Sequence, residues 1–314
     1  METVHSRRNS KRPQVNTIHL DLHEDKPMGD GQRQTLFTAG EHALLTADFK
    51  AAGIDPNRFG FYDQLAFLAR ESASPAYLTR YAEWVITRPI APDYAAHVRA
   101  VVPKLAHLLA TAFAAYDARG RCIAASCMMT RMLDRLQVWS FGIFGSVVLE
   151  VPALDLRRTI HTIAFKGASR KVAGHAWVCA PPFLVVDFSL ALQHWDPPIA
   201  RLIPDVVLAE SQASAVHASV EDCVSDGVRA LFAQTEGWPD PFLHHRLDPR
   251  LAGFHQRFPA RDVMVPDLQM RFVPVVVQQP AERLEQMELN GVEQAGRTIW
   301  NNYVGPAFDI PALS

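Results

Sequence analysis

The chain has 314 residues, of which 48% are hydrophobic and 20% are charged, a balance typical of a folded protein rather than a disordered one. Its formal net charge of −2 argues against nucleic acid as the main partner, because proteins that bind nucleic acid usually carry a basic excess. No apolar run reaches the roughly 18 residues that span a bilayer, and the N-terminus lacks the apolar segment of a secretory signal, so we expect no membrane contact.

The cysteines indicate the redox environment of the protein. They are too scattered for a zinc knuckle or a secreted disulfide framework. Reduced thiols and a cytoplasmic location are therefore expected. The four are Cys122, Cys127, Cys179 and Cys223.

The N-terminal third of the chain divides into two stretches. Residues 1–34 are polar and aperiodic, and we interpret them as a disordered tail. His19 and His23 in this tail lie near acidic residues and could in principle bind a metal, but without partner ligands a solvated tail is favoured. Residues 35–116 have helical spacing and form a predicted N-terminal helical layer, in which we assign the aromatic side chains to a core.

The rest of the chain comprises a predicted catalytic core, residues 117–200, and a C-terminal extension, residues 201–314. The core begins with a helix over 123–136, which is followed by strands over 140–151 and 159–165. The extension is a mixture of helical and irregular stretches, with a short strand over 271–277 and a helix over 280–300. We expect the extension to pack on the same domain as the core.

The clearest hairpin in the sequence joins residues 174–179 to residues 183–188 around Pro181-Pro182. His175 and Asp187 are equidistant from Pro181, so a symmetric hairpin places them opposite each other on one face of the sheet. Their Cβ atoms would then lie about 5 Å apart, close enough for the side chains to form a hydrogen bond.

Cys122 heads the predicted helix over 123–136, where the helix dipole favours a thiolate. A nearby imidazolium stabilises such a thiolate and can protonate a leaving group, and a carboxylate on the other ring nitrogen fixes the tautomer. Cys122, His175 and Asp187 have the chain order and the expected positions for these three roles. A buried structural thiol would be the simpler interpretation of Cys122 alone, but the combination favours function. The backbone N–H of Cys122 is the oxyanion donor that we expect.

The stretch from Gly120 to Leu190 resembles the transglutaminase-like superfamily of papain-like cysteine enzymes. The family's His-Ala-Trp-Val segment is present as His175-Ala176-Trp177-Val178, and Val186-Asp187-Phe188 stands where the family has Val-Asp-Pro. Leu136-Gln137-Val138-Trp139 follows the cysteine helix at the offset of a Leu-Gly-Ile-Pro-like turn. Gln137 replaces the usual glycine and Phe188 the usual proline, and Ala124 stands where an acidic residue often follows the cysteine.

The resemblance implies an α+β fold with a papain-like, transglutaminase-like core, in which the Cys-bearing helix packs on an antiparallel sheet beneath a helical N-terminal layer. It assigns Cys122, His175 and Asp187 to a catalytic triad that acts through a thioester acyl-enzyme. A cysteine-dependent hydrolase of a peptide or amide bond, needing no cofactor, is the first expectation, and its substrate is a peptide, a protein or a small amide. Acyl transfer to an amine, of the transglutaminase or N-acyltransferase type, and a non-catalytic binding module that retains the fold are the alternatives, with a redox sensor third. The oligomeric state stays open.

Other side chains near the predicted triad are weaker candidates. Trp177, Cys179 and Trp139 are weak candidates for contact with substrate, although a core position is the simpler interpretation of Cys179. Cys127 lies on a different face of the helix from Cys122, so we expect it in the core.

Four histidines outside the hairpin are assigned no chemistry. His161 lies in a predicted strand, where a single histidine is usually structural. His244, His245 and His255 might suggest a metal site, but no cysteine or acidic residue has ligand spacing with them. We expect exposed loop histidines and no bound metal.

Overall fold

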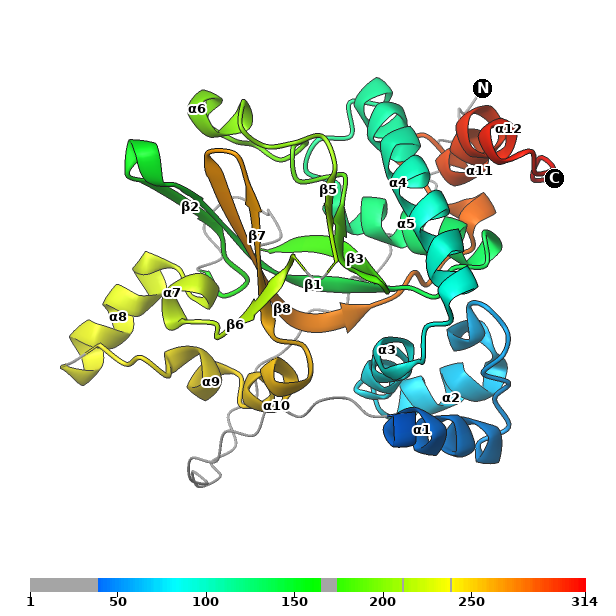
Figure 1. The fold of residues 1–314 in the computed structure, drawn as a ribbon. Helices are drawn as coiled ribbons and strands as arrows, with labels where there is room; N and C mark the ends of the chain where they lie inside the picture. Colours follow the sequence, from blue (N-terminus) through cyan, green and yellow to red (C-terminus); the bar gives the residue numbers. More distant parts are fainter. Residues whose placement is uncertain (1–38, 165–173, 211, 238) are drawn as a thin grey trace, which may run out of the picture. The chain divides into compact units, whose positions relative to one another are not determined.

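The computed structural model describes residues 39–164, 174–210, 212–237 and 239–314 (Figure 1). The predicted tail over 1–34, with His19 and His23, lies outside the described residues. Within the described part, helices combine with one curled antiparallel sheet, which confirms the expected α+β class.

The sheet has eight strands, of which seven follow the order β5-β4-β3-β1-β8-β7-β6, and β2 pairs with β1 beside this path. The strands are β1 Phe141–Val151, β2 Leu156–Ile160, β3 His175–Ala180, β4 Phe183–Asp187, β5 Val207–Ala209, β6 Ser214–Val216, β7 Ala260–Val265 and β8 Leu268–Gln278. β1 is the central strand of the sheet. It pairs with β8 over most of its length. It also pairs with β3 over its first half and with β2 over its second half. Its Phe-, Ile- and Val-rich sequence suits a strand that is covered on both faces.

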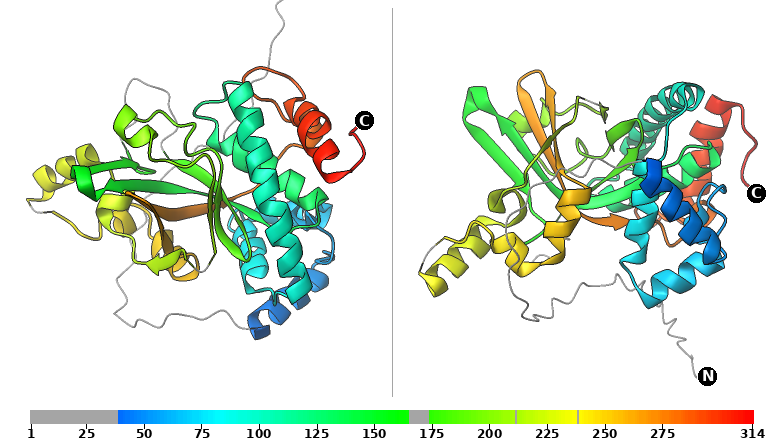
Figure 2. Two further views of the ribbon diagram at one scale, coloured as in Figure 1. Left: turned by 45° about the horizontal axis from the view of Figure 1, so that its top comes forward. Right: turned by 60° about the horizontal axis from the view of Figure 1, so that its bottom comes forward.

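Helices cover both faces of the sheet (Figures 1 and 2). α5 packs against β3 and β1 on one face, with α4 packed against α5. α3 and α10 pack on the opposite face, where α1 contacts α3. The helices are α1 Ala39–Ala51, α2 Leu65–Ala73, α3 Tyr77–Thr87, α4 Pro92–Ala115, α5 Cys122–Arg135, α6 Pro197–Ala200, α7 Val220–Cys223, α8 Asp226–Glu236, α9 Leu243–Leu247, α10 Arg250–Arg257, α11 Ala295–Ile299 and α12 Gly305–Phe308.

Two hydrophobic clusters share the sheet because successive strand residues point to opposite faces. Trp177 and Cys179 of β3 join the cluster under α1–α3, whereas Val178 and Ala180 join the cluster under α4 and α5. The aromatic residues of the N-terminal layer are core residues, as predicted. The largest of them that are fully buried are Phe49, Phe61, Phe67, Tyr81 and Phe113.

A largely buried polar network fixes α5 to the N-terminal layer. The Tyr62 hydroxyl donates a hydrogen bond to Asp134 Oδ2 at 2.5 Å, and Arg131 forms an ion pair with Asp63. Arg131 is only 8% exposed and also donates to the Pro280 carbonyl oxygen at 2.9 Å. Because Arg131 and Asp134 both bind residues of the N-terminal layer, this network constrains the rotation of α5 about its axis.

The C-terminal extension differs from its prediction. The strand predicted over 271–277 is the eleven-residue β8, and β5, β6 and β7 were not predicted. The helix predicted over 280–300 is wrong, because Asn290, Gly291 and Gln294 have positive φ angles of 51°, 80° and 57° that turn the chain out of a helix. A 3₁₀ turn at Leu284–Gln286 and the short α11 replace it, followed by a π-helical turn at Trp300–Val304.

α4 is long and apolar enough to span a membrane by length and composition alone, contrary to the expectation from the sequence. One face of α4 is packed against the protein, since Val98, Val102, Leu105 and Leu109 are fully buried in the cluster that α4 shares with α5. A core helix of a soluble protein passes the same test of length and composition, so this feature alone is weak support for a membrane span.

Gly145 sits at the most crowded point of β1. It pairs with His175 of β3 on one side and with Pro274 of β8 on the other. A Cβ at this position would lie 2.0 Å from the Val273 carbonyl oxygen and 2.7 Å from the ring of Trp177. Neither the backbone of β8 nor a buried indole can move aside easily, so only glycine fits.

Gly145→Ala should lower the free energy of unfolding by about 3 kcal/mol, the upper end for overpacking in a core. Gly253→Ala is the matched control, because a Cβ at Gly253 in α10 would meet no atom within 4 Å. Alanine also favours a helix by up to about 1 kcal/mol over glycine, so the control should be neutral or stabilising. Urea unfolding followed by circular dichroism measures both, and equal effects would contradict the close packing at Gly145.

Candidate active site

Cys122 is the first residue of α5, as predicted. Gly120 has a φ of 69° in the turn before it, a left-handed conformation that glycine adopts without strain. The N-cap residue, Arg121, makes no side-chain hydrogen bond to the first turn, and the N–H groups at the start of a helix favour an anion. The Cys122 side chain is buried, with 7% of the residue exposed.

His175 and Asp187 form the hydrogen-bonded pair that was predicted. His175 Nε2 lies 2.6 Å from Asp187 Oδ2, and the two residues are 0% and 2% exposed. The second carboxylate oxygen, Oδ1, accepts hydrogen bonds from Ser189 N at 2.8 Å, Ser189 Oγ at 3.0 Å and Leu190 N at 3.1 Å. Both oxygens of the carboxylate are therefore held, which fixes the direction in which it meets the imidazole.

The contribution of Ser189 was missed in the sequence. An aspartate that accepts hydrogen bonds from backbone N–H groups two and three residues later forms a common local motif, so Asp187 followed by Ser189 was a usable signal.

The register of the hairpin differs from its prediction. Val178 pairs with Val186, and the register shifts between Val178 and Ala180, so the hairpin is not symmetric about Pro181. His175 and Asp187 are consequently diagonal neighbours on one face rather than direct partners. The side chains of His175 and Asp187 are long enough to meet across this diagonal, and they form the hydrogen bond described above.

His175 also interacts with Cys122. Burial alone would lower the pKa of His175, but the charge and hydrogen bond of Asp187, and then the neighbouring Cys122 thiol, outweigh burial and raise the pKa to about 10. Because Asp187 occupies Nε2, and Nδ1 is buried without another hydrogen-bond partner among the described residues, Nδ1 is the ring nitrogen left for the thiol. The structure thus brings Cys122, His175 and Asp187 together in the order thiol, imidazole, carboxylate.

The three weak candidates for substrate contact all lie in the core. Trp177 is 2% exposed and packs edge-on against Phe272 at 5.2 Å between ring centroids. Trp139 is 3% exposed and stacks on Phe59 at 4.2 Å. Cys179 Sγ contacts the Phe183 carbonyl oxygen at 3.6 Å inside the same cluster.

The other thiols have environments that suppress their ionisation. Burial raises the pKa values of Cys127, Cys179 and Cys223 to about 12. All four cysteines, including Cys122, are free thiols. The other three thiols, of which Cys127 is only partly buried, provide internal references for the reactivity of Cys122.

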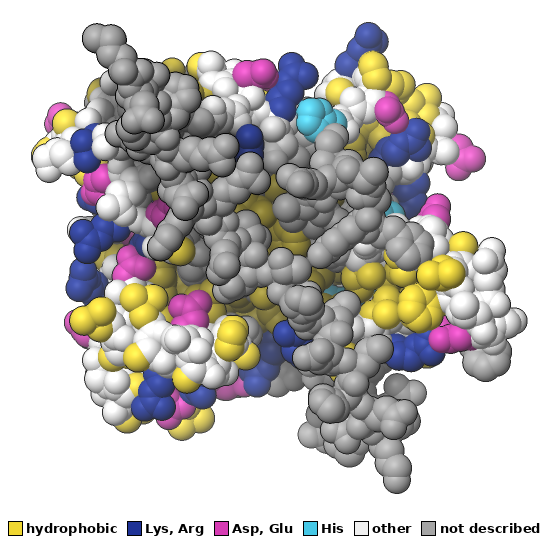
Figure 3. Space-filling view, turned by 180° about the vertical axis from the view of Figure 1, so that it is seen from behind, with side chains coloured by type: hydrophobic (Ala, Val, Ile, Leu, Met, Phe, Trp, Pro, Cys, Tyr) yellow, Lys and Arg dark blue, Asp and Glu magenta, His cyan; other side chains and the backbone are white. Residues whose placement is uncertain are grey.

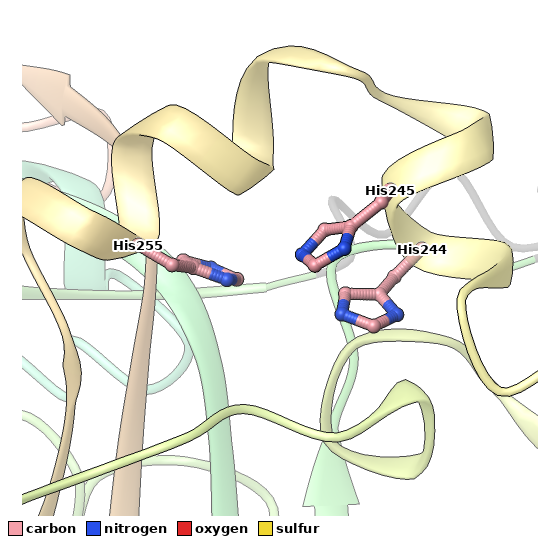
Figure 4. Close-up of side chains that lie close together, drawn as sticks. All are labelled: His244, His245 and His255. Carbon is pink, nitrogen blue, oxygen red and sulfur yellow. The ribbon is translucent and has the colours of Figure 1, made fainter. Parts of the chain in front are cut away.

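The expectation of exposed loop histidines at positions 244, 245 and 255 is wrong. His244 lies on α9 and is 2% exposed, and the three rings gather between α9 and α10 (Figure 4). One ring nitrogen from each histidine lies within 4.8 Å of the others. The strand predicted over 159–165 is β2, which ends at Ile160, so His161 lies just beyond the strand, with Nε2 3.1 Å from the Glu221 carbonyl oxygen.

The surface and the cavities give little information about a ligand. On the face drawn in Figure 3, basic and acidic side chains of the described residues are interspersed rather than gathered into a field of one sign. A shallow cavity of about 390 Å³ lies at the C-terminal helices, between Asn301 and Ala312, and contains none of the predicted site residues. No family model, curated protein or solved structure matches the chain.

The raised pKa of His175 makes stability depend on pH. The folded protein retains the imidazolium proton above the ordinary pKa of 6.5, whereas the unfolded chain releases it. This stabilisation is complete below pH 6.5 and is lost as pH rises towards 10, by up to roughly 1.4 kcal/mol per pH unit. Urea unfolding between pH 6 and pH 9 should show this decline in the natural sequence and a flatter profile in His175→Gln. Parallel profiles would contradict the assignment.

Proposed function

We propose that this protein is a cysteine-dependent hydrolase of a peptide or amide bond and that its core belongs to the transglutaminase-like type. The observation that carries the proposal is the buried 2.6 Å hydrogen bond between His175 and Asp187, with Cys122 beside the imidazole at the start of α5. A histidine held by a carboxylate and adjacent to a helix-start thiol is the arrangement that nucleophilic thiol catalysis requires.

Two further features support a transglutaminase-like core, and a third bears on the cellular compartment. The Cys-bearing α5 packs directly on β3 and β1 of an antiparallel sheet, and β3 and β4 carry the histidine and the aspartate. Gln137 has a φ of 59°, the left-handed conformation that would suit the glycine usual in the family. Four free thiols also suit a reducing, cytoplasmic compartment.

In the proposed mechanism, the Cys122 thiolate attacks the carbonyl carbon of an amide and forms a carbon–sulfur bond. The negative charge on the carbonyl oxygen is stabilised by backbone N–H groups of the first turn of α5, among them that of Cys122. The His175 imidazolium transfers its proton to the nitrogen as the carbon–nitrogen bond breaks, which releases the amine. His175 then removes a proton from water, the resulting hydroxide attacks the thioester, and the acid and the thiolate are released.

Asp187 positions the ring throughout these steps. Its two oxygens are occupied by His175 on one side and by the Ser189 and Leu190 donors on the other, so the carboxylate is held in one orientation. It keeps Nδ1 directed to the thiol and stabilises the imidazolium. If an amine replaces water in the second half, the same site performs acyl transfer.

Cys122 should be alkylated by iodoacetamide faster than the other three cysteines at pH 6.5, because thiolate character sets the rate and burial keeps the other thiols protonated. His175→Ala and His175→Gln should each lower the Cys122 rate by at least about 10-fold at this pH, since the adjacent cation is lost. Mass spectrometry of each cysteine-containing peptide over pH 5.5–9.5 measures the rates.

His161→Ala is the matched control, because His161 contacts the Glu221 carbonyl oxygen and lies outside the triad. It should leave the reactivity of Cys122 unchanged. If Cys122 reacts no faster than Cys127 across the pH range in a folded sample, the thiol is not activated and a non-catalytic binding module is the better description. If Cys122 is activated, single-turnover assays with amide substrates, with and without an added amine, distinguish hydrolysis from acyl transfer.

A further inference from the structure

A second group of side chains with evident chemistry lies on α9 and α10. His244 and His245 are adjacent on α9, and His255 projects from α10 towards them (Figure 4). α9 ends at Leu247 and α10 begins at Arg250, so a two-residue connection folds α10 back and faces its histidine to the pair. The rings of His244 and His245 have centroids 3.9 Å apart, and the centroid of His255 lies 6.0 Å from that of His245.

His244 is buried without a hydrogen-bond partner. Only 2% of its surface is exposed, and neither Nδ1 nor Nε2 has a partner among the described residues. A neutral imidazole carries one N–H donor and one acceptor, and leaving such groups buried and unpaired typically costs about 1–3 kcal/mol each. An ion coordinated by the acceptor nitrogen would remove part of this cost.

His255 is held in a tautomer suited to metal binding. Its Nε2 lies 2.9 Å from the Pro274 carbonyl oxygen, so Nε2 carries the proton and donates it, and the lone pair lies on Nδ1. A backbone carbonyl that accepts the second N–H of a ligating histidine is the usual outer partner in metal sites, where it fixes the ring orientation. Pro274 lies in β8, at the point where the register between β8 and β1 shifts, opposite Phe144 and Gly145.

The three rings are in the protonation state that a metal needs. Burial, reinforced for His244 by its two histidine neighbours, lowers the pKa values of His244 and His255 to about 4, and burial lowers the pKa of His245 as well. Metal ions bind the neutral form of imidazole, so the direction of these shifts is the one that coordination favours. The nearby Asp222 does not compete as a ligand, because its carboxylate is engaged by Arg157, Arg271 and the Ser219 backbone.

We propose that His244, His245 and His255 bind a divalent transition-metal ion, with zinc as the occupant and solvent completing the coordination. Neutral imidazole nitrogens suit zinc, which accepts three protein ligands plus a water molecule. Ligand nitrogens in a tetrahedral zinc site lie about 3.3 Å apart, so the widest separation of 4.8 Å must shrink by about 1.5 Å. His245 and His255 are half-buried, whereas His244 is buried, so His245, which has no backbone partner among the described residues of the kind that holds His255, is the ring that would move most.

The bound ion would join two helices that are too short to be stable on their own. α9 has five residues and α10 has eight, and isolated helices of this length are marginal in water. A metal shared between them, with His255 also bound to β8, would fasten both helices to the sheet. The site thus predicts a zinc-dependent increase in thermal stability.

The test uses the full chain after removal of metal with a chelator. Zn²⁺ is titrated in competition with a chromophoric chelator, and thermal unfolding is recorded with and without Zn²⁺. About one Zn²⁺ per chain should bind and raise the unfolding midpoint. His244→Ala and His255→Gln should each weaken Zn²⁺ binding by more than roughly 10- to 100-fold, the loss that follows removal of a group that only hydrogen-bonds a metal ligand. Each variant should also abolish the Zn²⁺-dependent increase in the unfolding temperature. Glutamine at position 255 can still donate to the Pro274 carbonyl, and far-UV circular dichroism confirms that each variant is folded.

Two control variants separate this site from other metal-binding groups. Cys122→Ser should retain Zn²⁺ binding, and so should His161→Ala, since neither residue belongs to the cluster. Co²⁺ in place of Zn²⁺ should give a visible spectrum without a sulfur charge-transfer band. The proposal is overturned if the chain binds no Zn²⁺ at micromolar concentration. It is also overturned if His244→Ala and His255→Gln bind Zn²⁺ as the natural sequence does, or if binding is lost in Cys122→Ser.

Discussion

The hydrogen bond between His175 and Asp187 is the interaction on which the arrangement of this protein depends. Both side chains are removed from water, where an ionised carboxylate is stable only if its lone pairs are occupied. The Ser189 and Leu190 donors meet that requirement on one side and the imidazole meets it on the other. The surrounding fold must therefore keep water out and hold β3 and β4 in one register.

The position of α5 is fixed by separate interactions that lie towards its far end. Arg131 and Asp134 bind Asp63 and Tyr62 of the N-terminal layer, roughly two to three helical turns from Cys122. A rigid helix transmits that constraint to its first residue, so the N-terminal layer helps to place the thiol although it contributes no atom to the triad.

The predictions from sequence succeeded where the pattern was strong and local. The apolar periodicity of α5, the β-branched run of β1 and the hairpin β3–β4 were read correctly to within one or two residues, and so was the face shared by His175 and Asp187. The diagonal register was not predictable, because the irregularity between Val178 and Ala180 leaves no mark in the composition. The histidine cluster was not predicted because it forms only when α10 folds back on α9. The spacing of the histidines along the sequence does not show that tertiary contact.

Gly145 connects the two histidine-containing regions across the sheet. It is the β1 residue that pairs with His175 on β3 and with Pro274 on β8, whose carbonyl oxygen holds His255. His175 and the carbonyl oxygen that holds His255 are therefore aligned by the same residue of β1. A one-residue insertion in the first half of β1 would displace both at once, so this segment tolerates changes of length far less than the loops at either end of it.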